Sequence, residues 1–126
     1  MTAKKILVVD DSNEDRELMK VILESRGYVV TEASNGRQAI ELINSDRPDL
    51  VFMDIRMPRV DGISASKLLK LDPLTRDIPL IIITSFAMHD EIEKIARDTG
   101  CADYLSKPID IRKTIEMVEK HIGKAE

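Results

Sequence analysis

Four short apolar runs in this chain end at residues suited to metal and phosphate chemistry. The polar residues at these ends are Asp10 and Asp11, Asp54, Thr84, and Lys107. Carboxylates are ligands for hard divalent cations and are nucleophiles for phosphoryl transfer. A hydroxyl and a compact ammonium suit the oxygens of a phosphoryl group. If the five side chains meet, they form a site for an anion held by a metal ion.

The elements that must position these side chains are the apolar runs themselves. They cover residues 6–9, 50–53, 80–83 and 104–106. Short apolar runs bounded by polar residues are typical of parallel strands that are buried on both faces. In open α/β sheets, ligands bind just beyond the carboxyl ends of the strands. We therefore predict that the polar ends converge at one edge of a sheet.

Segments with helical spacing alternate with the strands along the whole chain. We predict helices over 13–26, from 34 to before Pro48, from Asp61 to 71, over 92–99 and over 111–122. Ser12 to Asp15 has the form of a capping box. The last helix is predicted to bury Ile111, Ile115, Val118 and Ile122. A strand at 28–31 has less apolar continuity and is expected near an edge. Alternation of this kind predicts a doubly wound α/β fold with five strands and five helices in one domain, 1–126, with its core at about 5–122.

Composition excludes several classes of protein. The 126 residues carry a net charge of −4 and are 43% hydrophobic and 3% aromatic. We expect no nucleic-acid partner, because no basic stripe is present and few rings could stack on bases. No apolar run could span a bilayer, and the start of the chain lacks a signal-peptide pattern. The single cysteine fits a reducing compartment, so we expect a cytoplasmic protein without membrane attachment.

Three carboxylates in one cleft would repel one another unless a cation joined them. Mg²⁺ is expected, since it takes oxygen ligands and usually combines one or two carboxylates with a phosphate. A metal ion, an ammonium and a hydroxyl around one carboxylate suit a transferring phosphoryl group.

These residues lie in motifs that resemble the receiver domain of two-component response regulators. The motifs are Val-Val-Asp-Asp at 8–11, Met-Asp-Ile-Arg-Met-Pro at 53–58 with Asp-Gly at 61–62, Thr-Ser at 84–85, and Tyr-Leu-Ser-Lys-Pro at 104–108. They occur in the family's order, and the resemblance runs from about Lys5 to Ile122. It implies a flavodoxin-like sheet with the strand order 2-1-3-4-5. It also implies a phosphoprotein of the stand-alone type, with no effector domain of its own, rather than an enzyme.

The resemblance also implies a role for each residue. Asp54 would accept a phosphoryl group from a histidine kinase or a histidine phosphotransfer protein. Asp10, Asp11, Asp54 and the main-chain carbonyl of Arg56 would hold Mg²⁺. Lys107 would pair with the phosphoryl oxygens, and its bond to Pro108 would be cis.

Thr84 and Tyr104 would form the switch that responds to phosphorylation. Thr84 would move toward the phosphoryl group and Tyr104 would turn inward. The altered surface, made by the fourth helix, fifth strand and fifth helix, would bind a downstream target protein. We expect a monomer or a weak homodimer.

Two large residues at variable positions, Arg56 and Phe86, flank the path of a hydrolytic water. They lead to the hypothesis of a long-lived phosphorylated state.

Each of these residues could instead have a purely structural role. Asp10 and Asp11 could be a capping pair, Lys107 could form a structural salt bridge with Asp54, and Tyr104 could be a core aromatic. His121 is expected at the surface.

Three other classes of protein compete with a phosphorylated receiver. A haloacid-dehalogenase-like hydrolase would need a second acid where Arg56 stands. A dinucleotide-binding domain would need glycine after the first strand. The alternative that remains is a receiver-like scaffold that binds partners without phosphorylation.

Overall fold

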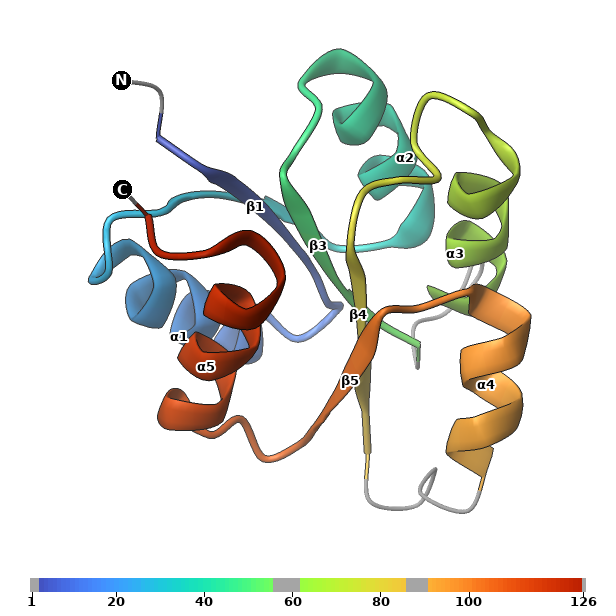
Figure 1. The fold of residues 1–126 in the computed structure, drawn as a ribbon. Helices are drawn as coiled ribbons and strands as arrows, with labels where there is room; N and C mark the ends of the chain where they lie inside the picture. Colours follow the sequence, from blue (N-terminus) through green and yellow to red (C-terminus); the bar gives the residue numbers. More distant parts are fainter. Residues whose placement is uncertain (1–2, 56–61, 86–90, 126) are drawn as a thin grey trace.

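The computed structural model describes residues 3–55, 62–85 and 91–125 (Figure 1). Within these ranges, strands and helices alternate from one end to the other. The strands are β1 (Lys5–Val9), β2 (Val29–Ala33), β3 (Leu50–Asp54), β4 (Leu80–Thr84) and β5 (Asp103–Ser106). The helices are α1 (Asn13–Glu24), α2 (Gly36–Ser45), α3 (Gly62–Leu71), α4 (Ile92–Thr99) and α5 (Ile111–Ile122). In this part of the chain, each helix is too short or too polar to cross a bilayer.

The strands form one parallel sheet with the order β2-β1-β3-β4-β5. Its register aligns the strands at their carboxyl ends, since Val9 pairs with both Ala33 and Met53. Farther along the sheet, Asp54 pairs with Ile83, and Thr84 pairs with Ser106. The predicted class and strand order are therefore confirmed, including the edge position of the second strand.

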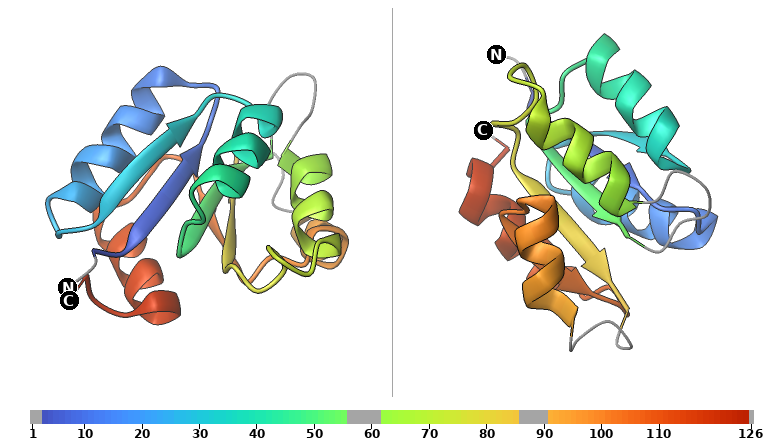
Figure 2. Two further views of the ribbon diagram at one scale, coloured as in Figure 1. Left: turned by 90° about the horizontal axis from the view of Figure 1, so that it is seen from above. Right: turned by 90° about the vertical axis from the view of Figure 1, so that its right-hand side faces the viewer.

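Helices cover both faces of the sheet (Figure 2). One hydrophobic cluster joins alternate residues of the central strands to α2, α3 and α4. The other cluster joins the remaining strand residues to α1 and α5. Every residue of β3 and β4 is buried, because layers on both sides exclude water. The apolar runs of the sequence follow directly from this double burial.

Local signals in the sequence set the helix ends. Ser12 is the N-cap of α1, and its hydroxyl accepts a hydrogen bond from the Asp15 N–H at 3.2 Å. Asn35 and Asp110 cap α2 and α5 in the same way. Gly100 follows α4 with a φ of 67°, a left-handed conformation that favours glycine. The expected cap of α3, Asp61, lies outside the described residues.

One prediction about α5 and one about β2 were wrong. Ile111 is 58% exposed, and Thr114 takes a buried place on α5 instead. Asp110 is the N-cap of α5, so Ile111 is the first residue of the helix, as predicted, but its side chain faces solvent. Tyr28 precedes β2 rather than opening it, and its hydroxyl donates to the Gly123 carbonyl at 2.8 Å.

The first and last described segments also contact each other (Figure 2). The Lys4 ammonium donates to the carbonyl oxygen of Ile122 and, at 2.7 Å, to that of Lys124. A cation at the carboxyl end of α5 is favourable, because the last carbonyls of a helix lack partners within the helix.

Candidate phosphoacceptor and metal site

The site lies at the carboxyl edge of the sheet, where the register aligns β1, β3, β4 and β5. Asp54 is the last residue of β3, and Thr84 is the last residue of β4. Asp10 directly follows β1, and Lys107 directly follows β5. The convergence predicted from the four apolar runs is thus present in the structure.

Three carboxylates meet at this edge. Asp10, Asp11 and Asp54 each offer an oxygen, and these atoms lie within 4.8 Å of one another. Asp10 and Asp54 are buried, with 1% and 3% exposure, whereas Asp11 is open to solvent. An all-oxygen donor set with one open side fits Mg²⁺, which keeps several of its waters. The expected carbonyl ligand at Arg56 lies outside the described residues.

The Lys107 ammonium contacts both buried carboxylates. Its Nζ lies 3.0 Å from Asp10 Oδ2 and 3.0 Å from Asp54 Oδ2. The main-chain N–H of Lys107 donates to the Thr84 carbonyl at 2.8 Å, which ties the loop after β5 to the end of β4. The bond between Lys107 and Pro108 is cis, as the resemblance implied.

A third carboxylate on Lys107 was missed by the sequence analysis. Asp15 Oδ2 lies 2.9 Å from Lys107 Nζ. The sequence pattern had assigned Asp15 only to the capping box of α1, but the Ser12 N–H donates to Asp10 and the Asp15 carboxylate contacts Lys107 instead. A signal was present, because a helical side chain leans back over the turn that precedes it. In α1 that direction leads to the sheet edge where the helix begins.

Arg16 is a second residue that the sequence analysis missed. Its guanidinium donates to the Asp10 carbonyl at 2.6 Å and lies 3.4 Å from Glu32 of β2. The Asp10 side chain accepts from the Ser12 N–H at 2.9 Å. These contacts fix the acidic loop after β1 from two sides. Ser12, rather than the two aspartates, caps α1.

The carboxylates around Lys107 carry more negative charge than its ammonium can neutralise. Burial raises the pKa of Asp10 to about 6, despite the hydrogen bond from Ser12, because removal from water disfavours a carboxylate. Burial alone would lower the pKa of Lys107, but hydrogen bonds to the surrounding carboxylates outweigh it and raise this pKa. One ammonium therefore faces an excess of negative charge, and a divalent cation would offset that excess.

Gly62 shows why the Asp-Gly pair of the motif matters. A Cβ atom at this position would lie 2.1 Å from the Asp54 carbonyl oxygen. The first residue of α3 therefore packs directly on the backbone of Asp54, and only glycine leaves room for it.

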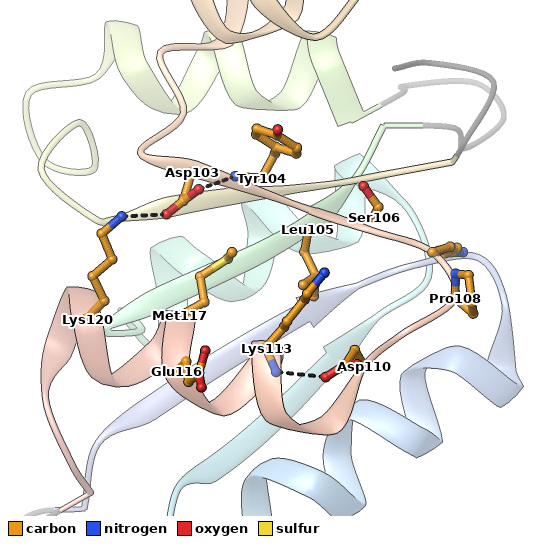
Figure 3. Close-up of a pocket in the computed structure, with 11 residues that line it drawn as sticks. Asp103, Tyr104, Leu105, Ser106, Pro108, Asp110, Lys113, Glu116, Met117 and Lys120 are labelled. Atoms are coloured by element: carbon orange, nitrogen blue, oxygen red, sulfur yellow. Dashed lines mark hydrogen bonds and ion pairs between the residues drawn. The ribbon is translucent and has the colours of Figure 1, made fainter.

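Thr84 and Tyr104 differ in burial. Thr84 is 2% exposed, whereas Tyr104, on β5, is 40% exposed. The reading of Tyr104 as a core aromatic is therefore wrong for this conformation. Figure 3 shows its ring on the opposite side of β5 from Leu105. Phe86 lies outside the described residues.

A hollow of about 630 Å³ lies beside the site, between β5 and α5 (Figure 3). Lys107 and Pro108 line one end of it, and Lys120 and Asp103 line the other. The hollow extends from the loop after β5 to the surface of α5.

Comparison with known proteins agrees with this geometry. A sequence model of the response regulator receiver domain matches residues 6–119. The chain belongs to the response regulator receiver domain family, whose members act in two-component signalling. A curated relative, the polar-differentiation response regulator DivK of Brucella anthropi, is 38% identical over 122 residues, which cover 97% of this chain and 98% of the relative.

Solved structures of receiver domains superpose closely on the chain. The receiver domain of a signal transduction histidine kinase from Syntrophus aciditrophicus has a TM-score of 0.88 at 32% identity, covering 95% of this chain and 90% of its own. The receiver domain of the sensor histidine kinase PA1611 from Pseudomonas aeruginosa has a TM-score of 0.87 at 30% identity, covering 98% and 100%. That structure holds a magnesium ion in its active-site cleft.

Proposed function

We propose that this receiver domain is a phosphorylation switch in which Asp54 accepts a phosphoryl group from a phosphohistidine. The donor is a histidine kinase or a histidine phosphotransfer protein. The observation that carries the proposal is the meeting of three carboxylates within 4.8 Å, two of them bound to Lys107. The match of the family over residues 6–119 supports one receiver domain with its core at about 5–122.

In the proposed transfer, a carboxylate oxygen of Asp54 forms a bond to phosphorus. The phosphorus–nitrogen bond of the phosphohistidine breaks, and the imidazole nitrogen keeps the electron pair and later takes up a proton. Lys107 moves its hydrogen bonds from carboxylate to phosphoryl oxygens, since its ammonium already lies 3.0 Å from Asp54. Thr84 donates its hydroxyl to another phosphoryl oxygen.

Asp10, Asp11 and Asp54 are the described residues that would hold Mg²⁺, together with the carbonyl of Arg56. When bound, the ion supplies positive charge to the phosphoryl oxygens. The magnesium ion in the PA1611 receiver domain, at 30% identity, supports this assignment.

Tyr104 and Thr84 carry the response to the surface. The 40% exposure of Tyr104 supports a resting conformation from which the ring turns inward. The surface of α4, β5 and α5 then binds a downstream target, and the hollow beside α5 is part of that surface. Phosphorylation biases a two-state equilibrium in this scheme.

The test is intact mass after incubation with acetyl phosphate and Mg²⁺, with Asp54→Asn and EDTA as controls. We expect one added phosphoryl group on the wild type, absent from the variant and absent with EDTA. If neither this donor nor a phosphorylated histidine phosphotransfer protein labels the wild type, the scaffold that works without phosphorylation replaces the proposal.

The lifetime of the phosphorylated state is a second part of the proposal. Arg56 and Phe86, at positions two after Asp54 and Thr84, slow the entry of the hydrolytic water. Loss of phosphate from the labelled protein should be faster for Arg56→Ala and Phe86→Ala. Unchanged rates in both variants would remove this part of the proposal.

A further inference from the structure

The Lys107 ammonium forms ion pairs with three carboxylates. Its Nζ lies 2.9 Å from Asp15, 3.0 Å from Asp10 and 3.0 Å from Asp54. The contact with Asp54 is a hydrogen bond, and those with Asp10 and Asp15 are ion pairs. A phosphoryl oxygen that approaches Lys107 therefore competes with three carboxylates for one ammonium.

The three carboxylates differ in how readily they can release the ammonium. The side chains of Asp10 and Asp54 are 1% and 5% exposed, and that of Asp15 is 33% exposed. A buried carboxylate that loses its partner stays out of water at a high cost, whereas water can solvate an exposed one. Asp15 is therefore the partner that Lys107 leaves most easily.

Asp15 also adds negative charge beside the acceptor. Asp15 and Asp54 contact the same nitrogen, so their bound oxygens are at most about 6 Å apart. A carboxylate at that distance attracts a divalent cation and repels a phosphoryl group. The two effects have opposite signs because the two ligands have opposite charges.

We propose that Asp15 is a positioning residue that holds part of the Lys107 ammonium away from Asp54, and so favours Mg²⁺ over the phosphoryl group at this site. The inference rests on the proposed function, because it concerns the acceptor role of Asp54. Neutralising Asp15 leaves Lys107 to Asp10 and Asp54, which weakens the cation site. It also leaves a less neutralised ammonium for an incoming anion.

The fold does not depend on the carboxylate of Asp15. The capping bond of α1 uses the main-chain N–H of Asp15 and the Ser12 hydroxyl. Asp15→Asn keeps this bond and the shape of the side chain. Glu14→Gln is a matched control, because Glu14 is an exposed acid in the same first turn of α1. Both variants remove one negative charge from the same helix end.

The experiment compares the wild type, Asp15→Asn and Glu14→Gln in two titrations followed by amide chemical shifts. The first titration uses Mg²⁺ alone, and the second uses beryllofluoride, a phosphoryl mimic, at saturating Mg²⁺. For Asp15→Asn we expect Mg²⁺ affinity to fall by about threefold to tenfold and beryllofluoride affinity to rise by a similar factor. Glu14→Gln should change each affinity by less than about twofold.

Opposite shifts for cation and anion are the signature of charge sharing, since local damage to the site would weaken both ligands. A loss of both affinities in Asp15→Asn, or shifts no larger than those of Glu14→Gln, would overturn the inference. A wild type that binds Mg²⁺ but neither binds beryllofluoride nor accepts a phosphoryl group would overturn the proposed function. In that case the claim that Asp15 weakens binding of the phosphoryl group would be overturned as well. The Mg²⁺ titration would still decide whether Asp15 strengthens Mg²⁺ binding.

Discussion

The two ends of β5 carry ionic clusters in which the roles of acid and base are exchanged. At the start of the strand, the single carboxylate of Asp103 lies 3.1 Å from Lys120 Nζ (Figure 3). The same carboxylate lies 3.2 Å from His121 Nε2. Just beyond the other end, the single ammonium of Lys107 lies within 3.0 Å of three carboxylates. The first cluster shares one anion among basic groups, and the second shares one cation among acids.

The two clusters differ in their balance of charge. Burial alone would raise the pKa of Asp103, but the hydrogen bonds that it accepts outweigh burial and lower its pKa. The Asp103 carboxylate is thus stable as an anion without any ligand. At Lys107 the balance is reversed, because Asp10 has a raised pKa and Asp11 adds further negative charge. A cluster that is short of positive charge can be stabilised by a bound metal ion.

The largest expected effect comes from removing the lysine of each cluster. Without Mg²⁺ at pH 7, Lys107→Met should lower the free energy of unfolding by about 2 kcal/mol, because two buried carboxylates lose their counter-charge. Lys120→Met should cost less than about 0.5 kcal/mol, since the Lys120 side chain is 69% exposed. Urea denaturation measures both values. Equal losses in the free energy of unfolding would mean that the two clusters have a similar balance of charge.

The next largest effect comes from neutralising one aspartate in each cluster. The resulting change in the free energy of unfolding should have opposite signs in the two clusters. Asp10→Asn removes one of several like charges, so it should raise the free energy of unfolding without Mg²⁺ by about 1 kcal/mol. Asp103→Asn removes the anion that two basic side chains share, so it should lower stability by about 1 kcal/mol.

Thermal denaturation with and without Mg²⁺ tests this reversal. The stabilisation of the wild type by Mg²⁺ should shrink in Asp10→Asn and stay unchanged in Asp103→Asn. Destabilisation of the metal-free protein by Asp10→Asn would show that the cluster at Lys107 is already balanced.

The smallest effect is a pH dependence that belongs to Asp103. Its pKa in the folded protein lies below the ordinary value of 3.8, so the folded state binds a proton more weakly than the unfolded state. The stabilisation is therefore fully present above pH 3.8 and is lost as the pH falls through the lowered pKa. The contribution should stay under about 1 kcal/mol. Acid titrations of stability should be less steep in Asp103→Asn, and identical slopes would contradict the assignment.

The sequence was sufficient for the architecture and for most of the site. Apolar runs that end at Asp54 and Thr84 predicted both the buried strands and their convergence, because double burial and a shared edge leave a clear pattern. Asp15 was missed because a capping motif already explained it. Its contact with Lys107 joins residues 92 positions apart in the chain, and sequence spacing does not encode such a contact.

The other errors have the same origin in tertiary packing. Ile111 satisfies the helical spacing of a buried stripe, yet it lies in the first turn of α5, where no neighbouring layer covers it. His121 was expected at the surface, but its side chain is only 16% exposed and contacts Asp103. The periodicity of apolar residues predicts which face of a helix is buried. It does not predict how much of the helix length is covered by the neighbouring sheet.

The contacts of Lys4 with the end of α5 bring the beginning and the end of the chain together. Lys4 and Lys124 lie at the edge of the sheet where the strands begin, opposite the candidate site. A short linker between them, with a new opening at the exposed Leu74, would connect the elements in another order around the same strand pairings. The candidate site at the far edge contains neither the linker nor the new opening, so its geometry should be retained.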